Sequence, residues 1–213
     1  ASPHRFGQAA RRQLELARET IAQALGADVA EVGGDRLVFT SGGTESNNLA
    51  ILGTARLRRD QGRHLITSTI EHHAVLHCFD YLEANEGFEV TRLPVDAQGR
   101  VDPQDLEEAI RPDTTLVSIM AANNEIGTLQ PVAALGEICR KMGVLFHTDA
   151  VQWFGKENFN DIGQFNADLV SICAHKFHGP KGAGALFIRS PLQPQPVALG
   201  GAHENERDRK SVV

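Results

Sequence analysis

The sequence predicts an α/β fold in which helices cover both faces of one mostly parallel β-sheet, giving three layers. Two observations lead to this expectation. Short β-rich runs alternate with longer helical patterns along the 213 residues, and most of these runs are continuously apolar. Strands of that kind are buried on both faces, and helical crossovers between them give parallel pairing. The length suffices for one substantial domain with its own core.

The expected elements follow in chain order. Strands are predicted at 36–40, 64–68, 89–93, 115–120, 144–148, 168–172 and 183–188. Helical patterns occupy 7–25, 44–60, 73–85, 103–110 and 132–142. Gly26, Gly62 and Gly143 stand where helix ends call for a left-handed residue. The domain is expected to span 1–200, and the charged tail 201–213, which has no apolar periodicity, is expected to be disordered.

Composition and charge exclude several classes of function. The net charge of −6 provides no basic surface for sequence-independent binding of nucleic acid. No apolar run approaches the length of a membrane span, and the first residues do not form the core of a signal peptide. Cys78, Cys139 and Cys173 form neither a paired framework nor a CxxC motif, so a reducing, cytoplasmic setting is expected.

Ligands of open α/β sheets bind outside the carboxyl ends of the strands, so the residues after each strand are the candidate site. Lys176 follows the apolar run 168–172 and precedes a Gly/Pro-rich turn. There it is expected to be half desolvated, which lowers the pKa of the amine and makes it a nucleophile toward aldehydes such as pyridoxal phosphate. His175 flanks it, whereas the competing Lys181 is expected to be exposed.

Other strand ends carry groups that suit the same ligand. Gly43 and Thr44 open a helix whose free N–H groups favour a phosphate. Asn124 belongs to a pair of carboxamides that can orient a ligand. Asp149 can pair with a protonated heterocyclic nitrogen, and Gln152 follows one turn later.

The histidines after the strand at 64–68 are candidates for a contact with the same ligand or for a metal site. His72 can stack on an aromatic ligand or move a proton near neutral pH. His73 and His77 have the i, i+4 spacing of zinc ligands, but no acidic third ligand follows at a suitable spacing, so no metal site is expected.

Each of these features also has an ordinary structural interpretation, and these stay open. Thr44 and Asp149 suit helix caps, the asparagines at 123–124 suit a turn, and His72 suits a helix start without further task. Their combination at five strand ends is what favours a cofactor site.

These motifs together resemble one enzyme family. The chain is similar to the NifS/IscS-type cysteine desulfurases, which are pyridoxal-phosphate enzymes of the class-V aminotransferase group. The matching segments are 41–50 (SGGTESNNLA), 71–75 (EHHAV), 123–127 (NNEIG), 147–152 (HTDAVQ) and 175–182 (HKFHGPKG). In order and spacing they cover nearly the whole chain.

The resemblance implies a role for each candidate residue. Lys176 would hold the cofactor as a Schiff base and move the substrate Cα proton, and His72 would stack on the ring and act as an acid–base group. Asp149 would pair with the pyridine nitrogen and Gln152 with the phenolic oxygen. Asn124 would approach the cofactor and the substrate carboxylate.

The phosphate would be bound by the remaining residues, Gly43, Thr44, Cys173 and His175. Cys173 stands where the family usually has a serine, and a thiol is a weaker donor, so one phosphate contact is expected to be weakened. A second departure is at Arg207–Ser211, which does not follow the family's Arg-containing segment after Gly200-Gly201.

The resemblance also implies a reaction and a setting. The fold would be the large domain of the aspartate aminotransferase type, and L-cysteine would become L-alanine with sulfur passing to an enzyme persulfide, for iron–sulfur clusters or other thio-compounds. A homodimer and a sulfur-acceptor or scaffold protein are the expected partners. The family's small C-terminal domain, with its sulfur-accepting cysteine, is expected to be absent. The alternatives are a selenocysteine lyase, another β-eliminating lyase of this cofactor class, or a truncated scaffold without catalysis.

Overall fold

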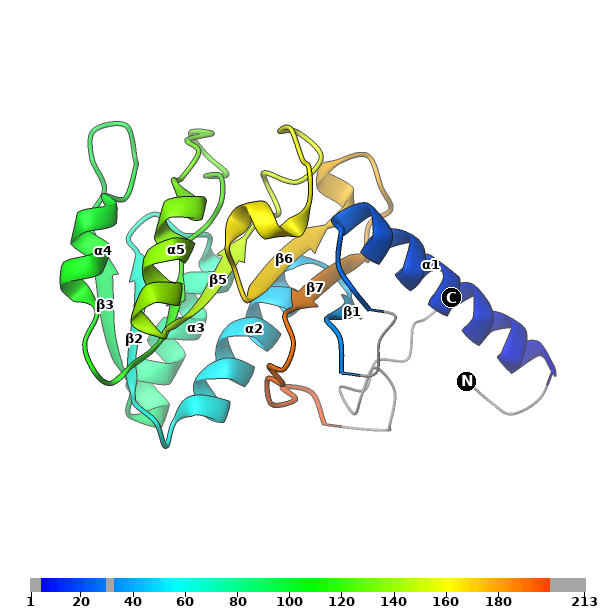
Figure 1. Ribbon diagram of the computed structural model, residues 1–213, viewed down its shortest axis with the longest axis horizontal. Coiled ribbons are helices and arrows are strands. Elements are labelled where there is room, and N and C mark those ends of the chain that lie inside the picture. Colours follow the sequence, from blue (N-terminus) through cyan, green and yellow to red (C-terminus); the bar gives the residue numbers. More distant parts are fainter. Residues whose placement is uncertain (1–4, 30–32, 200–213) are drawn as a thin grey trace.

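The computed structural model describes residues 5–29 and 33–199, which form a seven-stranded sheet flanked by helices (Figure 1). The elements in chain order are α1 (Arg5–Leu25), β1 (Arg36–Thr40), α2 (Gly43–Arg58), β2 (His64–Ser68), α3 (His73–Glu86), β3 (Glu89–Leu93), α4 (Pro103–Ala109), β4 (Thr114–Ser118), α5 (Val132–Met142), β5 (Leu145–Asp149), the 3₁₀ turn η1 (Ile162–Phe165), β6 (Leu169–Cys173), the 3₁₀ turn η2 (Ala174–Lys176) and β7 (Gly184–Ile188).

The strand order across the sheet is β1-β7-β6-β5-β4-β2-β3. The strands β6, β5, β4, β2 and β3 pair in parallel, while β7 is antiparallel to both of its neighbours. The carboxyl ends of β1, β2, β4, β5 and β6 therefore meet at one edge of the sheet. The predicted mostly parallel α/β fold is confirmed.

Two apolar cores occupy the two faces of the sheet, which confirms the three-layer arrangement. Helices α2 and α3 cover one face, and α4, α5 and the last turn of α1 cover the other (Figure 1). Successive residues of a strand point to opposite faces. In β5, Phe146 therefore belongs to the α5 side, while His147 and Asp149 point to the α2 side. Asp149 thus ends its strand facing α2.

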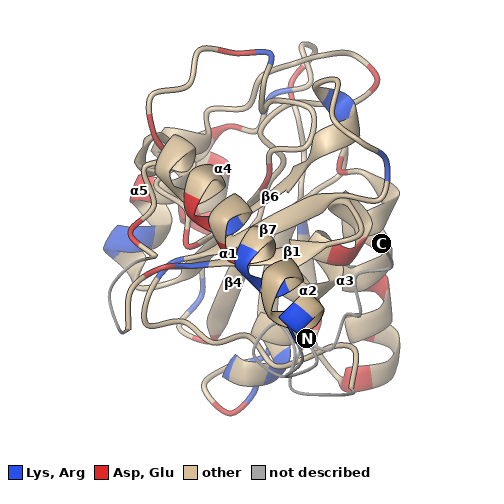
Figure 2. Cartoon of the chain, turned by 90° about the vertical axis from the view of Figure 1, so that its right-hand side faces the viewer, with Lys and Arg blue, Asp and Glu red and all other residues tan. Residues whose placement is uncertain are grey.

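The fully buried residues of α1 lie in its last turn. Its buried residues are Ala22 and Leu25, and the remainder extends away from the sheet (Figure 1). Near the middle of the helix, Arg18 lies 4.7 Å from the ring centroid of Phe39 on β1. Basic and acidic residues are intermixed along the helices and loops in Figure 2.

Most predicted element bounds agree with the structure to within two residues, but one glycine was assigned the wrong role. Gly26 and Gly143 adopt the predicted left-handed conformation after α1 and α5, with φ of 67° and 72°. Gly62 does not. It is required for close approach instead, because a Cβ there would lie 2.1 Å from the Asp113 carbonyl oxygen. The predicted tail 201–213 lies outside the described residues. No helix among the described residues is long and apolar enough to span a membrane.

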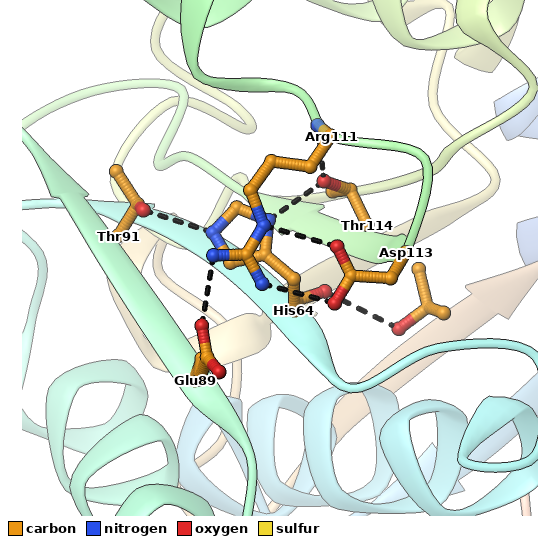
Figure 3. Close-up of polar contacts among 7 residues, drawn as sticks. His64, Glu89, Thr91, Arg111, Asp113 and Thr114 are labelled. Atoms are coloured by element: carbon orange, nitrogen blue, oxygen red, sulfur yellow. Dashed lines mark hydrogen bonds and ion pairs between the residues drawn. The ribbon is translucent and has the colours of Figure 1, made fainter.

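The amino edge of the sheet holds a closed polar cluster around His64 (Figure 3). The imidazole is fully buried, and its two nitrogens lie 2.7 Å from the Thr114 hydroxyl and 2.8 Å from the Thr91 hydroxyl. Arg111 closes the cluster with ion pairs to Asp113 and Glu89. Burial, and then the charge of Arg111, lowers the pKa of His64. The cluster joins β2, β3 and β4 where these strands begin.

Candidate active site

Five strand ends converge on one cavity at the carboxyl edge of the sheet. Its volume is about 460 Å³, within the usual range for small-molecule sites. The lining residues come from the segments after β1, β2, β4, β5 and β6: Gly43, Thr44, Asn47, His72, Met120, Ala122, Asn124, Glu125, Asp149, Val151, Gln152, His175 and Lys176. Of the nine residues predicted for the site, eight line this cavity, and Cys173 does not.

Asp149 is the buried acid of the cavity. Its Oδ2 accepts a hydrogen bond of 2.6 Å from Asn47 Nδ2, and its Oδ1 accepts one of 2.9 Å from Val151 N–H. Burial raises the pKa of Asp149, while the two hydrogen bonds and the nearby His72 act in the opposite direction. Asp149 therefore accepts a hydrogen bond from Val151 N–H, as a helix cap would, and its carboxylate still lines the cavity.

The start of α2 lies against the end of β5. A Cβ on Gly43 would lie 2.8 Å from Val151 Cγ2, so this contact requires glycine. The carboxylate of Glu45 accepts hydrogen bonds from both the N–H and the hydroxyl of Ser41. Thr44 lies within the first turn, and α2 has no side-chain cap. The capping interpretation of Thr44 is therefore wrong, and its side chain is left to the cavity.

His72 is itself the cap of α3. Its Nδ1 accepts a hydrogen bond of 3.0 Å from Ala74 N–H. A neutral imidazole that accepts at Nδ1 carries its hydrogen on Nε2. This cap is an ordinary structural role for a histidine at a helix start, and the same residue also lines the cavity.

The two asparagines after β4 have different environments. Asn123 accepts from Glu125 N–H and Ile126 N–H and donates to the Ile70 carbonyl, so its carboxamide is used by the turn. Asn124 lines the cavity and donates only to the neighbouring Glu125 carboxylate, at 2.6 Å. The turn interpretation holds for the first residue, and the second is the one available to a ligand.

Lys176 lies at the rim of the cavity on η2, and it is exposed. The expectation that it is half desolvated is wrong, because the 3₁₀ turn lifts it beyond the end of β6. It nevertheless lines the same cavity as Asp149. Gln152 also lines it, with its Oε1 accepting from Lys156 Nζ. Lys181 is exposed as predicted.

Cys173 lies behind the cavity rather than in it. The thiol is fully buried, and its Sγ lies 2.9 Å from His175 Nδ1 and 3.6 Å from the Ala183 carbonyl oxygen. Cys173 therefore does not line the cavity that the other eight predicted residues share. The thiol sits at the last position of β6, whose side chain packs toward Gly42, and it reaches the cavity only through His175.

Asn47 is a buried polar residue of the cavity that the sequence analysis did not single out. It lies one turn into α2, where its carboxamide is 1% exposed and holds Asp149. Its Oδ1 is buried and has no hydrogen-bond partner among the described residues. A polar residue on the buried face of a helix that starts at the site was the available signal.

Comparison with known proteins assigns this arrangement to a family. Residues 1–211 match the class-V aminotransferase family. The chain belongs to that family.

Relatives of this family share about half of the chain's residues. The chain is 51% identical over 207 residues to a cysteine desulfurase IscS of Dictyoglomus turgidum, covering 97% of this chain and 51% of the relative. It is 51% identical to one of Methanosarcina thermophila, covering 97% of this chain and 50% of the relative. The chain thus spans about half the length of the curated relatives it matches. The resemblance to the NifS/IscS-type enzymes is confirmed.

Solved structures of class-V relatives show the same fold. A structure described as SspA in complex with cysteine has a TM-score of 0.88 at 42% identity and covers 97% of this chain and 58% of its own. A NifS-like protein has a TM-score of 0.89 at 42% identity, with 96% and 55% covered.

Class-V aminotransferases depend on pyridoxal 5′-phosphate, and the cavity residues fit that group. A buried carboxylate suits a ring nitrogen that carries a proton. The unpaired Asn47 Oδ1 and the Thr44 side chain offer polar atoms that the protein itself does not use. Lys176 at the rim places an amine beside the same cavity, where an aldehyde could reach it.

Proposed function

We propose that this chain is the cofactor-binding portion of a cysteine desulfurase that uses pyridoxal phosphate to convert L-cysteine to L-alanine. The observation that carries the proposal is the convergence of Lys176, Asp149 and His72 on one cavity of about 460 Å³. The names of the 51% identical relatives and of the cysteine-bound structure support the choice of substrate.

Each side of the cofactor has a proposed partner. Asp149, held by Asn47, would keep a proton on the pyridine nitrogen, and Gln152 would meet the phenolic oxygen. His72 would lie against the ring. The bound cofactor supplies an aldehyde that condenses with amines and a ring that withdraws electrons from Cα.

The phosphate would lie at the start of α2. Gly43 and Thr44 provide free N–H groups and a hydroxyl there, and His175 lines the same cavity. Cys173 would contribute through His175 rather than directly, because its Sγ contacts the imidazole Nδ1.

The other proposed steps are proton transfers and orientation. Lys176 would take the Cα proton of the substrate, because it lines the same cavity as Asp149 and His72. Asn124 would orient the substrate carboxylate through its carboxamide. His72, with its hydrogen on Nε2, would hold or deliver a proton near the substrate sulfur.

The sulfur balance requires a thiol. Cysteine and an acceptor thiol give alanine and a persulfide: the C–S bond breaks and an S–S bond forms. The two sulfur atoms together lose two electrons, which the substrate Cβ takes up as it becomes the methyl group of alanine, so no further oxidant or reductant is needed. Burial raises the pKa of both Cys78 and Cys139 to about 12, and Cys173 is buried behind the cavity. We therefore place the acceptor cysteine outside these 213 residues, on a further part of the protein or on a partner.

A homodimer in the cytoplasm is the proposed setting. A second cavity of about 650 Å³ runs between α2 and α3 and shares Thr44 and His72 with the first, so a second copy seated there would border the cofactor. The three free cysteines favour a reducing compartment. Sedimentation of the cofactor-loaded protein tests the dimer: a monomer at all concentrations would contradict it.

Borohydride reduction tests the cofactor assignment. The protein loaded with pyridoxal phosphate is reduced, digested and examined by mass spectrometry, and the pyridoxyl group is expected on Lys176. The matched control Lys181→Ala should keep the adduct, while Lys176→Ala should lose it together with the near-visible absorbance. Reduction without any adduct, or an adduct on Lys181, would favour the scaffold alternative.

Turnover then distinguishes the enzyme classes. With a thiol acceptor present, alanine from L-cysteine is the expected product. Alanine from selenocysteine alone would indicate a selenocysteine lyase, and pyruvate would indicate β-elimination.

A further inference from the structure

Glu71 is a buried acid that the proposed mechanism does not use. The side chain is 5% exposed and directly precedes His72. Its Oε1 accepts a hydrogen bond of 2.6 Å from the Ser68 hydroxyl and one of 3.0 Å from Met120 N–H. Its Oε2 is buried without a hydrogen-bond partner among the described residues. A buried acid of this kind needs a structural or functional reason.

The turn that carries His72 is held to the end of β4 by two side-chain bonds. One is the bond from Met120 N–H to Glu71, and the other is the 2.9 Å bond from Asn123 Nδ2 to the Ile70 carbonyl. The residue after Met120 is bonded in turn to β5, because Ala121 N–H donates to the Asp149 carbonyl at 2.9 Å. Glu71 therefore links the histidine side of the cavity to the strand end that carries the buried acid.

We propose that Glu71 is a positioning residue of the active site, whose carboxyl group fixes the His72 turn to the end of β4 and so sets where the imidazole stands in the cavity wall. The inference rests on the proposed function, because only that function places a cofactor against His72. It extends that function to a residue with no direct contact to the cavity, since Glu71 is absent from its lining.

The environment of Glu71 favours the neutral acid. Burial raises the pKa of Glu71 to about 8, and the negative charge of Asp149 on β5 acts in the same direction. The hydrogen bonds from Ser68 and Met120 N–H act in the opposite direction without offsetting the burial. A charged Glu71 would leave an unpaired anionic oxygen inside the protein, which is costly, whereas a neutral one leaves only a polar atom.

The protonation of Glu71 makes the stability of the protein depend on pH, and this pH signature can be measured without the cofactor. The pKa of Glu71 is higher in the folded than in the unfolded chain, so the folded state holds the extra proton between about pH 4.5 and 8. The stability of the wild type therefore falls as pH rises through that window. Glu71→Gln is neutral at every pH and lacks this fall.

The first experiment compares melting temperatures of the cofactor-free protein from pH 6 to 9.5. The difference between Glu71→Gln and wild type should grow by about 3 °C per pH unit up to about pH 8 and level off above it. Glu107→Gln, an exposed acid on α4, is the matched control and should give a difference that does not change with pH. A flat difference for Glu71→Gln would overturn the inference.

The second experiment observes His72 itself. The imidazole resonances of His72, assigned with His72→Gln, should keep their wild-type shifts in Glu71→Gln and move in Glu71→Ala. Glu71→Asp, which is one methylene shorter, should move them as well and serves if the alanine variant does not fold. Equal movement in Glu71→Gln and Glu71→Asp would contradict a role for the carboxyl length and geometry.

The third measurement separates this inference from the proposed function. The affinity for pyridoxal phosphate should fall about tenfold in Glu71→Asp and stay within about twofold in Glu71→Gln, since tenfold corresponds to the loss of one well-placed hydrogen bond. If the wild type binds no pyridoxal phosphate while the pH signature is present, the proposed function fails alone. If the wild type binds it and the signature is absent, the role of Glu71 fails alone.

Discussion

The two edges of the sheet hold polar clusters that differ in one respect. At the amino edge, both nitrogens of His64 have partners, and Arg111 is paired with two acids (Figure 3). At the carboxyl edge, Asn47 Oδ1 and Glu71 Oε2 are buried without partners among the described residues. In the first cluster both ring nitrogens have hydrogen-bond partners, whereas the second cluster contains two buried oxygen atoms without a partner.

The difference indicates which cluster contributes to stability and which is kept for a ligand. Buried polar groups are nearly always satisfied, so unsatisfied ones concentrate where something else binds. Both clusters contain a histidine and acids, so residue composition does not distinguish them. The number of buried polar atoms without a hydrogen-bond partner does distinguish them. Variants at the two edges should accordingly affect different measurements.

The largest effect is expected at the closed edge. His64→Ala removes a fully buried side chain and leaves the hydroxyls of Thr91 and Thr114 without the ring. We expect a loss of about 3 kcal/mol in the free energy of unfolding, with unchanged affinity for pyridoxal phosphate. Urea denaturation measures the free energy of unfolding, and a cofactor titration measures the affinity. A fall in affinity at unchanged stability would show that the His64 cluster serves the ligand rather than stability.

The opposite pattern is expected for Asp149→Asn at the open edge. Affinity for pyridoxal phosphate should fall about 100-fold, or about 2.7 kcal/mol, because the ring nitrogen loses its anionic partner. Stability of the cofactor-free protein at pH 8 should be equal or higher. Burial raises the pKa of Asp149 in the folded chain, so the charged form is a cost that grows as pH rises, and asparagine removes it.

Asp168→Asn is the matched control for that variant. Asp168 is also an acid whose pKa is raised by burial, and it accepts from Phe146 N–H beside β5, away from the cavity. Affinity for the cofactor should not change. A similar loss of affinity in both variants would mean that the Asp149 result reports a general disturbance of β5.

The pH dependence of His147 gives a smaller effect. This imidazole is fully buried between the hydroxyls of Ser118 and Ser171, and burial lowers its pKa to about 3. The unfolded chain takes up a proton near pH 6.5 and the folded chain does not, so this residue's contribution to stability is lost as pH falls. Between pH 7 and 5, wild type should lose about 2 kcal/mol relative to His147→Gln, measured by urea denaturation at each pH. A constant difference would show that the ring takes up its proton equally in the folded and the unfolded chain.

The smallest effect is expected for Cys173→Ser. A serine hydroxyl can take over the contact with His175 Nδ1, so stability should change by less than about 1 kcal/mol and affinity for pyridoxal phosphate by less than about threefold. If the residue contacted the phosphate directly, the stronger donor would raise the affinity about tenfold or more. The cofactor titration distinguishes the two arrangements.

The sequence predicted the sheet and most of the cavity because both follow from local patterns. The continuous apolar runs located the strands, and parallel pairing placed their ends, with Asp149 and His72, at one edge. The role of Gly62 was not accessible, because it depends on Asp113, which is 51 positions away. The same holds for Asn47, whose bond to Asp149 joins residues 102 positions apart.

The positions of Cys173 and Lys176 relative to the cavity could not be predicted, for a related reason. The direction of a side chain at the end of a strand depends on how the following turn begins. Here η2 starts immediately after β6, which lifts Lys176 into solvent and leaves Cys173 under the turn. Residue type and spacing do not distinguish a side chain that enters a cavity from one that supports its wall.

The antiparallel pairing of β6 with β7 has a consequence for how the protein folds. The loop 174–183 that bears Lys176 is closed by the bond from Ala174 N–H to the Ala183 carbonyl, so the hairpin can form from contacts close in the chain. Such contacts cost little loop entropy and form fast, whereas the Asn47–Asp149 bond must wait for distant segments to meet. During synthesis or refolding, the amine that would capture the aldehyde is therefore expected to be in place before the acid that would activate the ring.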